Sequence, residues 1–556
     1  MTSLHPVTPH PSAGRWARLL TLAALALALP ACTSSPSSGS SSSASGSDPR
    51  VGLKAGLHDA GTAAEGLKLV AHQNKPDAFK AVGGLDFANS DLAFGGHYAY
   101  QGNFSGLQIW NISNPASPTL AAAYPCFTEQ GDVSVDGHLL FVSAENTGSR
   151  LDCGMQGDTA RVSKARMLGI RIFDVSDPAH PKQVADVQTC RGSHTHTLVP
   201  DPEDKGVVYV YVSGLARVRS GQEMPGCESS NLTTDPNNAL FRIEVIKVPL
   251  AHPEQAKIVS HPRIFSDLMA PPTHGVAYAD TANGAAVKAA RRRLGRLGLP
   301  ASATAADSDR AARLYAAMQS SRDDSARAQA FADSLQQMGL TVRRRPARPR
   351  MGPSQCHDIT VYPWAHLAAG ACSGYGLLLN IQDPTHPVRL QAVSDSNFSF
   401  WHSATFSNDA SALLYTDEWG GGTQPKCRAS DPKDWGADAI FTLQHDSLTQ
   451  VGYYKVPAAQ TPQENCVAHN GGLIPVPGRT IMVQGWYQGG ISVFDWTDPA
   501  HPKEIAYFDR GPISADSLVL GGYWAGYYYN GYIYGSEIAR GLDVFQLTPT
   551  KDLTQN

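Results

Sequence analysis

Histidines recur at one position of a repeated pattern of strand pairs. His196 (with His194 two residues before it), His357, His402 and His469 each stand where the first strand of such a pair is expected to begin. Imidazole nitrogens are ligands for zinc, copper, iron and nickel. If these strands converge on one axis, the four rings meet there, and His196, His357, His402 and His469 are predicted metal ligands. A structural role, in which each ring ties its strand to a neighbouring loop, is the alternative, and the sequence leaves both open.

Acidic and aromatic residues occupy related positions. Asp91 and Asp132 open the first strands of two units without histidine. Further residues follow the second strands of other units, where they would share the same face: Glu145, Asp417, Glu418, Trp486 and Glu537. Together these residues form a predicted binding face, in which carboxylates could orient the imidazole rings. Asp417 and Glu418 are neighbours and should point to opposite sides of a strand, which makes them poor partners for glycoside hydrolysis.

Familiar catalytic motifs are missing from the sequence. It contains no G-x-S-x-G, no H-E-x-x-H and no P-loop. The run Gly420–Gly422 is not followed by a helical pattern, so it does not predict a phosphate-binding loop. The formal net charge of −4 argues against nucleic acid as a partner.

The strands that must position these residues are predicted by a sequence phrase that recurs along the chain. "GLQIWNISNPASP" begins at Gly106, and related phrases begin at Gly169, Tyr375, Gly490 and, in shorter form, Gly541. Weaker copies begin at Phe241 and Ala439. Each is an alternating apolar strand that ends in a proline turn, and a pair of strands precedes it. With a final edge strand, each unit is a four-stranded antiparallel meander.

The sequence pattern of these repeats resembles that of the LVIVD-repeat family of bacterial β-propeller lipoproteins, and the resemblance covers most of residues 85–548. The resemblance and the unit count imply an all-β fold, a seven-bladed β-propeller of four-stranded antiparallel blades with one helical insertion. Blades 1–3 are assigned to residues 61–285 and blades 4–7 to residues 351–549. The resemblance implies no defined reaction.

Residues 286–350 lack the strand pattern and carry 14 Lys and Arg against five Asp and Glu. They are predicted to form a basic helical or disordered insertion, with Ser308 or Asp309 capping the first helix. A contact arm for an anionic surface and a simple solvated hairpin are both compatible with this composition.

The N-terminus is predicted to be a lipoprotein signal peptide, residues 1–31. Arg15 and Arg18 precede a short apolar run that ends in "LPAC", which resembles a bacterial lipobox with Cys32 as the acylated residue. An ordinary secretory signal is the alternative. Residues 32–60 begin with a Ser/Gly-rich stretch and are predicted to be a tether.

Eight cysteines follow Cys32, an even number that indicates disulfides in an exported chain. They are Cys126, Cys153, Cys190, Cys227, Cys356, Cys372, Cys427 and Cys466. Their pairing is open, because eight cysteines allow 105 connectivities.

The first functional hypothesis is a scaffold, exported and anchored to a membrane through Cys32 on the periplasmic or extracellular face. Its histidine, acid and aromatic face would capture a ligand or partner protein at the cell envelope. The alternative is a metal-dependent enzyme, an oxidase or hydrolase, with a histidine-ligated transition metal at the channel mouth. Whether the protein is an enzyme, and whether a metal cofactor is bound, the sequence does not decide.

Overall fold

A computed structural model describes residues 48–80, 85–230, 235, 237–271, 304–320, 325–340 and 352–550. The predicted signal peptide and Cys32 lie outside these residues. The described chain is built almost entirely from antiparallel β-sheets, five with four strands and one with nine. No helix among the described residues is long and apolar enough to cross a membrane.

Each four-stranded sheet is a meander of consecutive strands, as the repeat predicts. The first two sheets are β3 (Asn89–Gly95), β4 (Tyr98–Asn103), β5 (Gly106–Asn111) and β6 (Thr119–Pro125), then β7 (Val133–Asp136), β8 (Leu139–Ala144), β9 (Gly169–Asp174) and β10 (Lys182–Gln188). The third is β11 (Thr195–Pro200), β12 (Val207–Ser213), β13 (Glu244–Pro249) and β14 (Lys257–Ser260). The fourth is β15 (Asp358–Tyr362), β16 (Leu367–Cys372), β17 (Tyr375–Asn380) and β18 (Val388–Val393). The fifth is β19 (Trp401–Phe406), β20 (Ala412–Asp417), β21 (Asp438–Gln444) and β22 (Ser447–Tyr454).

The nine-stranded sheet contains two more meanders. They are β23 (Asn470–Val476), β24 (Arg479–Gly485), β25 (Ile491–Asp495) and β26 (Lys503–Arg510), then β27 (Tyr523–Tyr529), β28 (Tyr532–Glu537) and β29 (Gly541–Leu547). A short parallel pairing of β23 with β27 joins them. The weak repeat copies at Phe241 and Ala439 are confirmed as strands β13 and β21.

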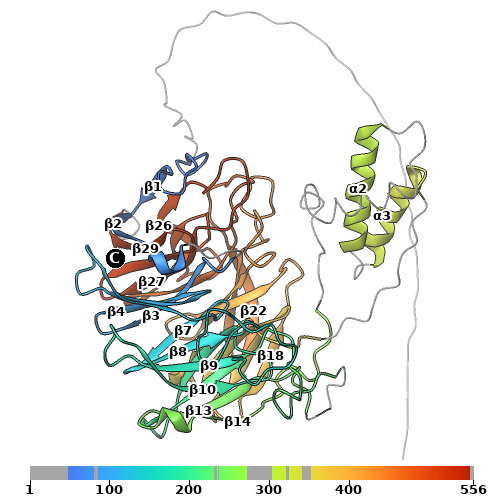
Figure 1. Ribbon diagram of the computed structural model, residues 1–556. Helices are drawn as coiled ribbons and strands as arrows, with labels where there is room; N and C mark the ends of the chain where they lie inside the picture. Colours follow the sequence, from blue (N-terminus) through green and yellow to red (C-terminus); the bar gives the residue numbers. More distant parts are fainter. Residues whose placement is uncertain are drawn as a thin grey trace, which may run out of the picture. The chain divides into compact units, whose positions relative to one another are not determined.

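The fourth strand of the last meander comes from the start of the chain. Strand β2 (Leu67–Asn74) pairs with β29, and β1 (Thr62–Glu65) pairs with β26. Figure 1 shows these blue N-terminal strands beside red C-terminal ones. The repeat did not predict this closure, because β1 and β2 carry no proline-turn phrase.

The first strands of successive meanders pack against one another, and the order closes on itself. It runs β3, β7, β11, β15, β19, β23, β27 and back to β3. Apolar side chains fill the space between neighbouring sheets, as in the cluster of Phe141 and Ile172 with Val210 and Ile246. Trp110 of β5 packs with Val544 of β29, which joins the first sheet to the last. The arrangement is a β-propeller, in which radial closure protects the sheet edges.

Among the described residues, three short 3-10 helices lie in the loops: η1 (Asp77–Phe79), η2 (Pro253–Gln255) and η4 (Pro363–Ala365). The described residues of the predicted insertion form the α-helices α2 (Ala305–Ser320) and α3 (Ser325–Gln337), which pack against each other. The cap prediction was wrong. Thr304 caps α2, since its hydroxyl accepts the Asp307 amide at 3.1 Å and donates to the Asp307 carboxylate at 2.8 Å. The chain already turns helical before Ser308 and Asp309.

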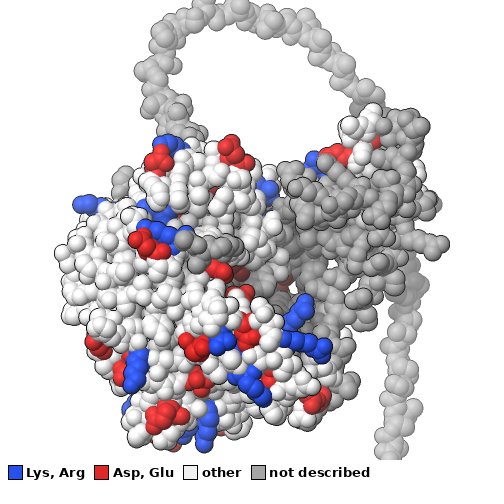
Figure 2. Space-filling model, in the orientation of Figure 1, with Lys and Arg blue, Asp and Glu red and all other residues white. Residues whose placement is uncertain are grey.

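Four disulfides connect sequence neighbours, which confirms the predicted framework. The pairs are Cys126–Cys153, Cys190–Cys227, Cys356–Cys372 and Cys427–Cys466. Four disulfides are consistent with an extracytoplasmic protein. On the face in Figure 2, acidic and basic side chains are interspersed.

Candidate metal centre

Four imidazole rings form a row where four consecutive inner strands begin. Ring centroids are 4.4 Å apart for His194 and His357, 3.9 Å for His357 and His402, and 4.1 Å for His402 and His469. Three of these residues immediately precede β11, β15 and β23, and His402 is the second residue of β19. The same repeat position therefore brings side chains separated by up to 275 residues into contact. All four are buried.

His196, the predicted member of this set, lies outside the row. Its Nδ1 atom is 2.8 Å from the Ser143 hydroxyl, and its amide donates to the Asp132 carboxylate at 3.0 Å. His194 occupies the row instead. Residues two apart on a strand are offset by about 6.6 Å along it, so only one of the two histidines can reach the neighbouring ring.

Hydrogen bonds hold the two ends of the row. The Nδ1 atom of His194 bonds to the Glu145 carboxylate, and its Nε2 atom lies 2.8 Å from Nε2 of His357. At the other end, Nδ1–H of His469 donates to the main-chain carbonyl of Trp524. This bond fixes the tautomer of His469 and leaves a lone pair on Nε2.

The remaining ring nitrogens are buried and have no hydrogen-bond partner among the described residues. They are both nitrogens of His402, Nδ1 of His357 and Nε2 of His469. Buried polar atoms are normally satisfied. Four such atoms in adjoining rings therefore point to a ligand that fills the space between them.

Glu418 supplies a carboxylate to the same space. Its Oε1 atom is 3.6 Å from Nε2 of His469, and its Oε2 atom is 3.9 Å from Nε2 of His402. One ligand atom from each of His357, His402 and Glu418 lies within 4.8 Å of the others. Bonds of about 2.1 Å to a tetrahedral ion separate ligand atoms by about 3.4 Å, so shifts on the order of an ångström would complete the coordination.

Burial sets the protonation of this cluster. It lowers the pKa of His357 and His402 well below the usual value, with neighbouring histidines adding to the effect, and it lowers the pKa of His469 to about 3. For His194 burial acts in the same direction, but attraction to the Glu145 carboxylate outweighs it and the pKa is raised. Three neutral rings thus present lone pairs for a metal.

The carboxyl group of Glu418 is also buried, and burial raises its pKa to about 7. A cation placed between the Glu418 carboxylate and the imidazole lone pairs would stabilise the charged carboxylate. At low pH a proton neutralises the carboxylate, and a divalent metal ion would also bind the imidazole nitrogens.

The glycine run beside Glu418 has a packing role. The Tyr487 hydroxyl donates to Oε1 of Glu418, and Gly422 covers this bond with φ +66°. A Cβ at Gly422 would lie 2.1 Å from the Tyr487 hydroxyl and 2.7 Å from Oε1. Glycine is therefore needed for this close approach. Sequence reasoning missed Tyr487, although it directly follows the predicted Trp486.

Three predicted binding-face residues lie inside the sheets, away from the row. The Asp417 carboxylate accepts the amides of Phe400 at 2.8 Å and Gly436 at 2.9 Å. Glu537 pairs with Arg540 at 2.8 Å, and Trp486 is fully buried in an apolar core. Asp417 and Glu537 are the last residues of β20 and β28, so their carboxylates bind main-chain amides and Arg540 beside these strand ends. Trp486, which directly follows β24, packs into the apolar layer.

Asp91 and Asp132 line a separate cavity of about 450 Å³ between inner strands, together with Asp358 and His196. Burial, reinforced by the Asp132 charge, raises the pKa of Asp91 to about 8 and of Asp358 to about 7. The structure therefore divides the predicted polar face into a histidine row and a carboxyl-lined channel.

Residues 88–125, which span β3 to β6, match the LVIVD repeat family. The chain therefore carries one sequence match to the LVIVD repeat within its β-propeller fold. The match begins just before the inner strand β3 and ends with the edge strand β6, so one LVIVD repeat corresponds to one four-stranded meander. No curated protein sequence matches this chain.

Several solved structures are similar to this chain at low identity. The periplasmic gluconolactonase PpgL of Pseudomonas aeruginosa is 10% identical over 80% of this chain and 93% of its own, with a TM-score of 0.40. BamB of Moraxella catarrhalis is 11% identical over 87% and 98%, with a TM-score of 0.36. Hydrazine synthase of Kuenenia stuttgartiensis is 7% identical over 80% and 91%, with a TM-score of 0.40. Similarity at this level carries no argument about function.

Proposed function

We propose that this protein is an extracytoplasmic binding scaffold of seven blades, in which the histidine row near the propeller axis holds a late first-row transition-metal ion. The closed order of seven inner strands supports the blade count. His357, His402 and His469 would supply nitrogens and Glu418 an oxygen, a donor set suited to zinc, copper, iron or nickel.

One observation carries this proposal. Buried imidazole nitrogens that have no hydrogen-bond partner in the described part of the chain lie beside the buried Glu418 carboxylate, and Trp524 holds His469 in the tautomer that presents Nε2 to it. A purely structural histidine row would be expected to satisfy these atoms within the protein.

Burial also favours a scaffold over an enzyme with a large substrate. Among the described residues, His402 and His469 are fully buried, and His194 is the most exposed ring at 8%. A catalytic metal needs a coordination position that substrate can reach. In this proposal the metal therefore fixes the positions of the inner strands at the histidine row and of the loops around it. These loops present the binding face for a ligand or partner at the cell envelope.

Elemental analysis of the purified protein tests the metal site. We expect about one equivalent of a transition metal in the native chain and its loss in a His357→Ala/His402→Ala double variant. The exposed His386, which pairs only with neighbouring turn residues, provides a His386→Ala control that should keep the metal. Metal below one-tenth of an equivalent after reconstitution, or the same content in the double variant, would refute the proposal.

The proposal also places the protein at the cell envelope through acylation of Cys32. Metabolic labelling with a radioactive fatty acid should mark the native chain in a bacterial host with lipoprotein maturation, and Cys32→Ser should abolish the label. Unlabelled native protein released without a membrane fraction would instead indicate an ordinary secretory signal.

A further inference from the structure

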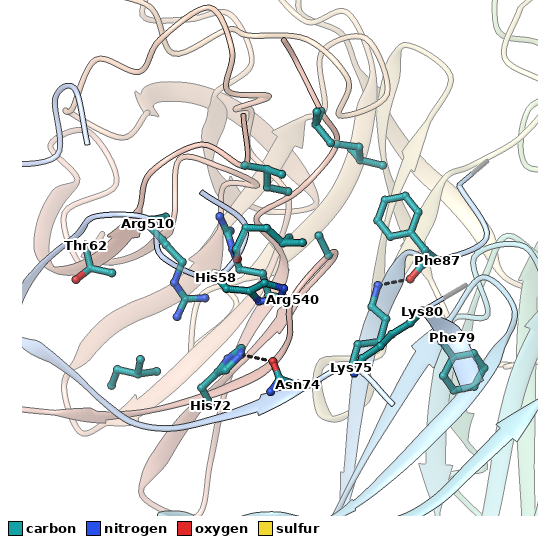
Figure 3. A pocket seen from close by; sticks show the side chains of 17 residues that line it. His58, Thr62, His72, Asn74, Lys75, Phe79, Lys80, Phe87, Arg510 and Arg540 are labelled. Atoms are coloured by element: carbon teal, nitrogen blue, oxygen red, sulfur yellow. Dashed lines mark hydrogen bonds between the residues drawn. The ribbon is translucent and has the colours of Figure 1, made fainter. Parts of the chain in front are cut away.

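A large cavity lies away from the histidine row, where the N-terminal segment closes the ring of sheets. It has a volume of about 990 Å³, within the range of pockets that hold small organic ligands. Its walls come from residues 57–62, strand β2, helix η1, and the segments that follow β26 and β28. Figure 3 shows the side chains that line it.

The lining combines basic and apolar side chains, and among the described residues it contains no aspartate or glutamate. His58, His72 and Arg510 lie on one side, as Figure 3 shows, and Lys75 and Lys80 on the other. Apolar side chains complete the wall: Leu57, Leu69, Phe79, Phe87, Ile513 and Leu520. This composition suits a molecule with a compact anionic head and an apolar chain.

The lining holds six basic side chains, and the ion pairs behind them use three carboxylates: Asp77 with Lys80, Glu537 with Arg540, and Asp543 with both Arg510 and His72. Arg510 and His72 share the single carboxylate of Asp543, at 3.0 Å and 2.6 Å respectively. The Arg510 atom in this ion pair is Nη1, which is buried and forms no hydrogen bond of good geometry among the described residues. Because one carboxylate serves two basic groups, this side of the cavity can accept a second anion.

Lys75 adds another buried positive charge. It is 4% exposed, and its ammonium group donates to the main-chain carbonyls of Phe87 and Ile538. No ion pair to Lys75 occurs within the described part of the chain. Its charge therefore adds to the positive potential of the cavity.

We propose that this cavity binds a single-chain amphiphile with a carboxylate or phosphate head, the head at Arg510, His72 and His58 and the alkyl chain against the apolar wall. A guanidinium group is suited to either head, because it can donate two parallel hydrogen bonds to carboxylate or phosphate oxygens. The apolar lining supplies the favourable free energy of burying the chain.

Calorimetric titration of the full chain tests the site with defined probes below their micellar concentrations. Dodecanoate and dodecyl phosphate carry the two heads, dodecanol carries the chain alone, and acetate carries a head alone. We expect at least one dodecyl anion to bind at least tenfold more tightly than dodecanol and acetate. Preference for dodecanoate would identify a fatty-acid-like ligand, and preference for dodecyl phosphate a phospholipid-like one.

Two variants locate the head group. Arg510→Gln, and His58→Glu at the exposed rim, should each weaken binding of the preferred anion at least tenfold. Arg479→Gln is the matched control, since Arg479 is also partly buried and paired with one aspartate, Asp495, but lies outside this cavity. Equal binding of dodecanol and the anions, or unchanged anion binding in both variants, would overturn the proposal. Because His58 is exposed, His58→Glu remains informative if Arg510→Gln fails to fold.

Discussion

The Nε2 atom of His469 lies 3.6 Å from Oε1 of Glu418, although the two residues belong to different blades. The bond from Nδ1–H of His469 to the Trp524 carbonyl turns the lone pair on Nε2 toward the carboxylate. The two groups can coordinate one cation, and this relationship leads to the first prediction.

His469→Ala should lower the affinity for Zn²⁺ at least tenfold, because it removes the ring whose tautomer is already fixed for coordination. In the native chain, Zn²⁺ at 100 times its dissociation constant should increase the free energy of unfolding by about 2.7 kcal/mol. Thermal unfolding with and without Zn²⁺ measures both effects. His196→Ala is the control, since His196 lies outside the row, and it should retain the stabilisation by Zn²⁺. An equal loss in both variants would contradict the assignment.

Gly422→Ala should destabilise the protein and weaken metal binding together. The left-handed backbone costs a non-glycine residue about 1–2 kcal/mol, and the new Cβ would also displace the Tyr487 hydroxyl and Glu418. Gly421→Ala is the matched control, because Gly421 has φ +63° with nothing within 4 Å of its Cβ. It should show only the backbone cost. Chemical denaturation and Zn²⁺ titration of both variants measure the difference, and identical behaviour would refute the role of Gly422.

Asp509→Asn should reduce the decrease in the free energy of unfolding that the native chain shows as pH rises. Burial raises the pKa of Asp509 to about 8, while an unfolded aspartate titrates near 4. Between these values the folded state binds more protons, so the stabilising effect of the protonated group is present at low pH and falls by about 1.4 kcal/mol per pH unit as pH rises.

Urea denaturation at pH 5.0 and 7.5 measures this effect. The variant should gain stability relative to the native chain at the higher pH, since asparagine can still accept the bond from Gln460. Asp498→Asn, at an exposed carboxyl whose pKa the His501 hydrogen bond lowers, should show no such gain. A constant difference between Asp509→Asn and the native chain at both pH values would contradict the prediction.

Removal of strand β2 should prevent closure of the propeller. A chain that starts at Pro76 lacks both β1 and β2 and leaves the edges of β26 and β29 unpaired. It also loses Leu67, which packs with Ile505 and Phe508. We expect aggregation or unfolding by circular dichroism and size exclusion. A chain that starts at Asp48 is the control and should unfold at the same temperature as the full chain.

The structure brings together only part of the predicted metal-ligand set, and His194 shows why. The repeat marked where inner strands begin, so it placed His357, His402 and His469 at equivalent positions. It could not choose between His194 and His196, because strand alternation puts both on one face. Whether the His194 ring or the His196 ring contacts His357 depends on how far β11 extends toward the central axis of the propeller.

The amino-acid sequence by itself determined the meander, the propeller architecture and the position of the histidines within each repeat. Alternation, glycine and proline turns are local properties that each copy carries independently. Only the tertiary structure decided the disulfide pairing, the closure by β2, the turn of Asp417, Trp486 and Glu537 into the blades, and the meeting of His469 with Glu418. These features depend on contacts between distant segments, which exist only once the ring has closed.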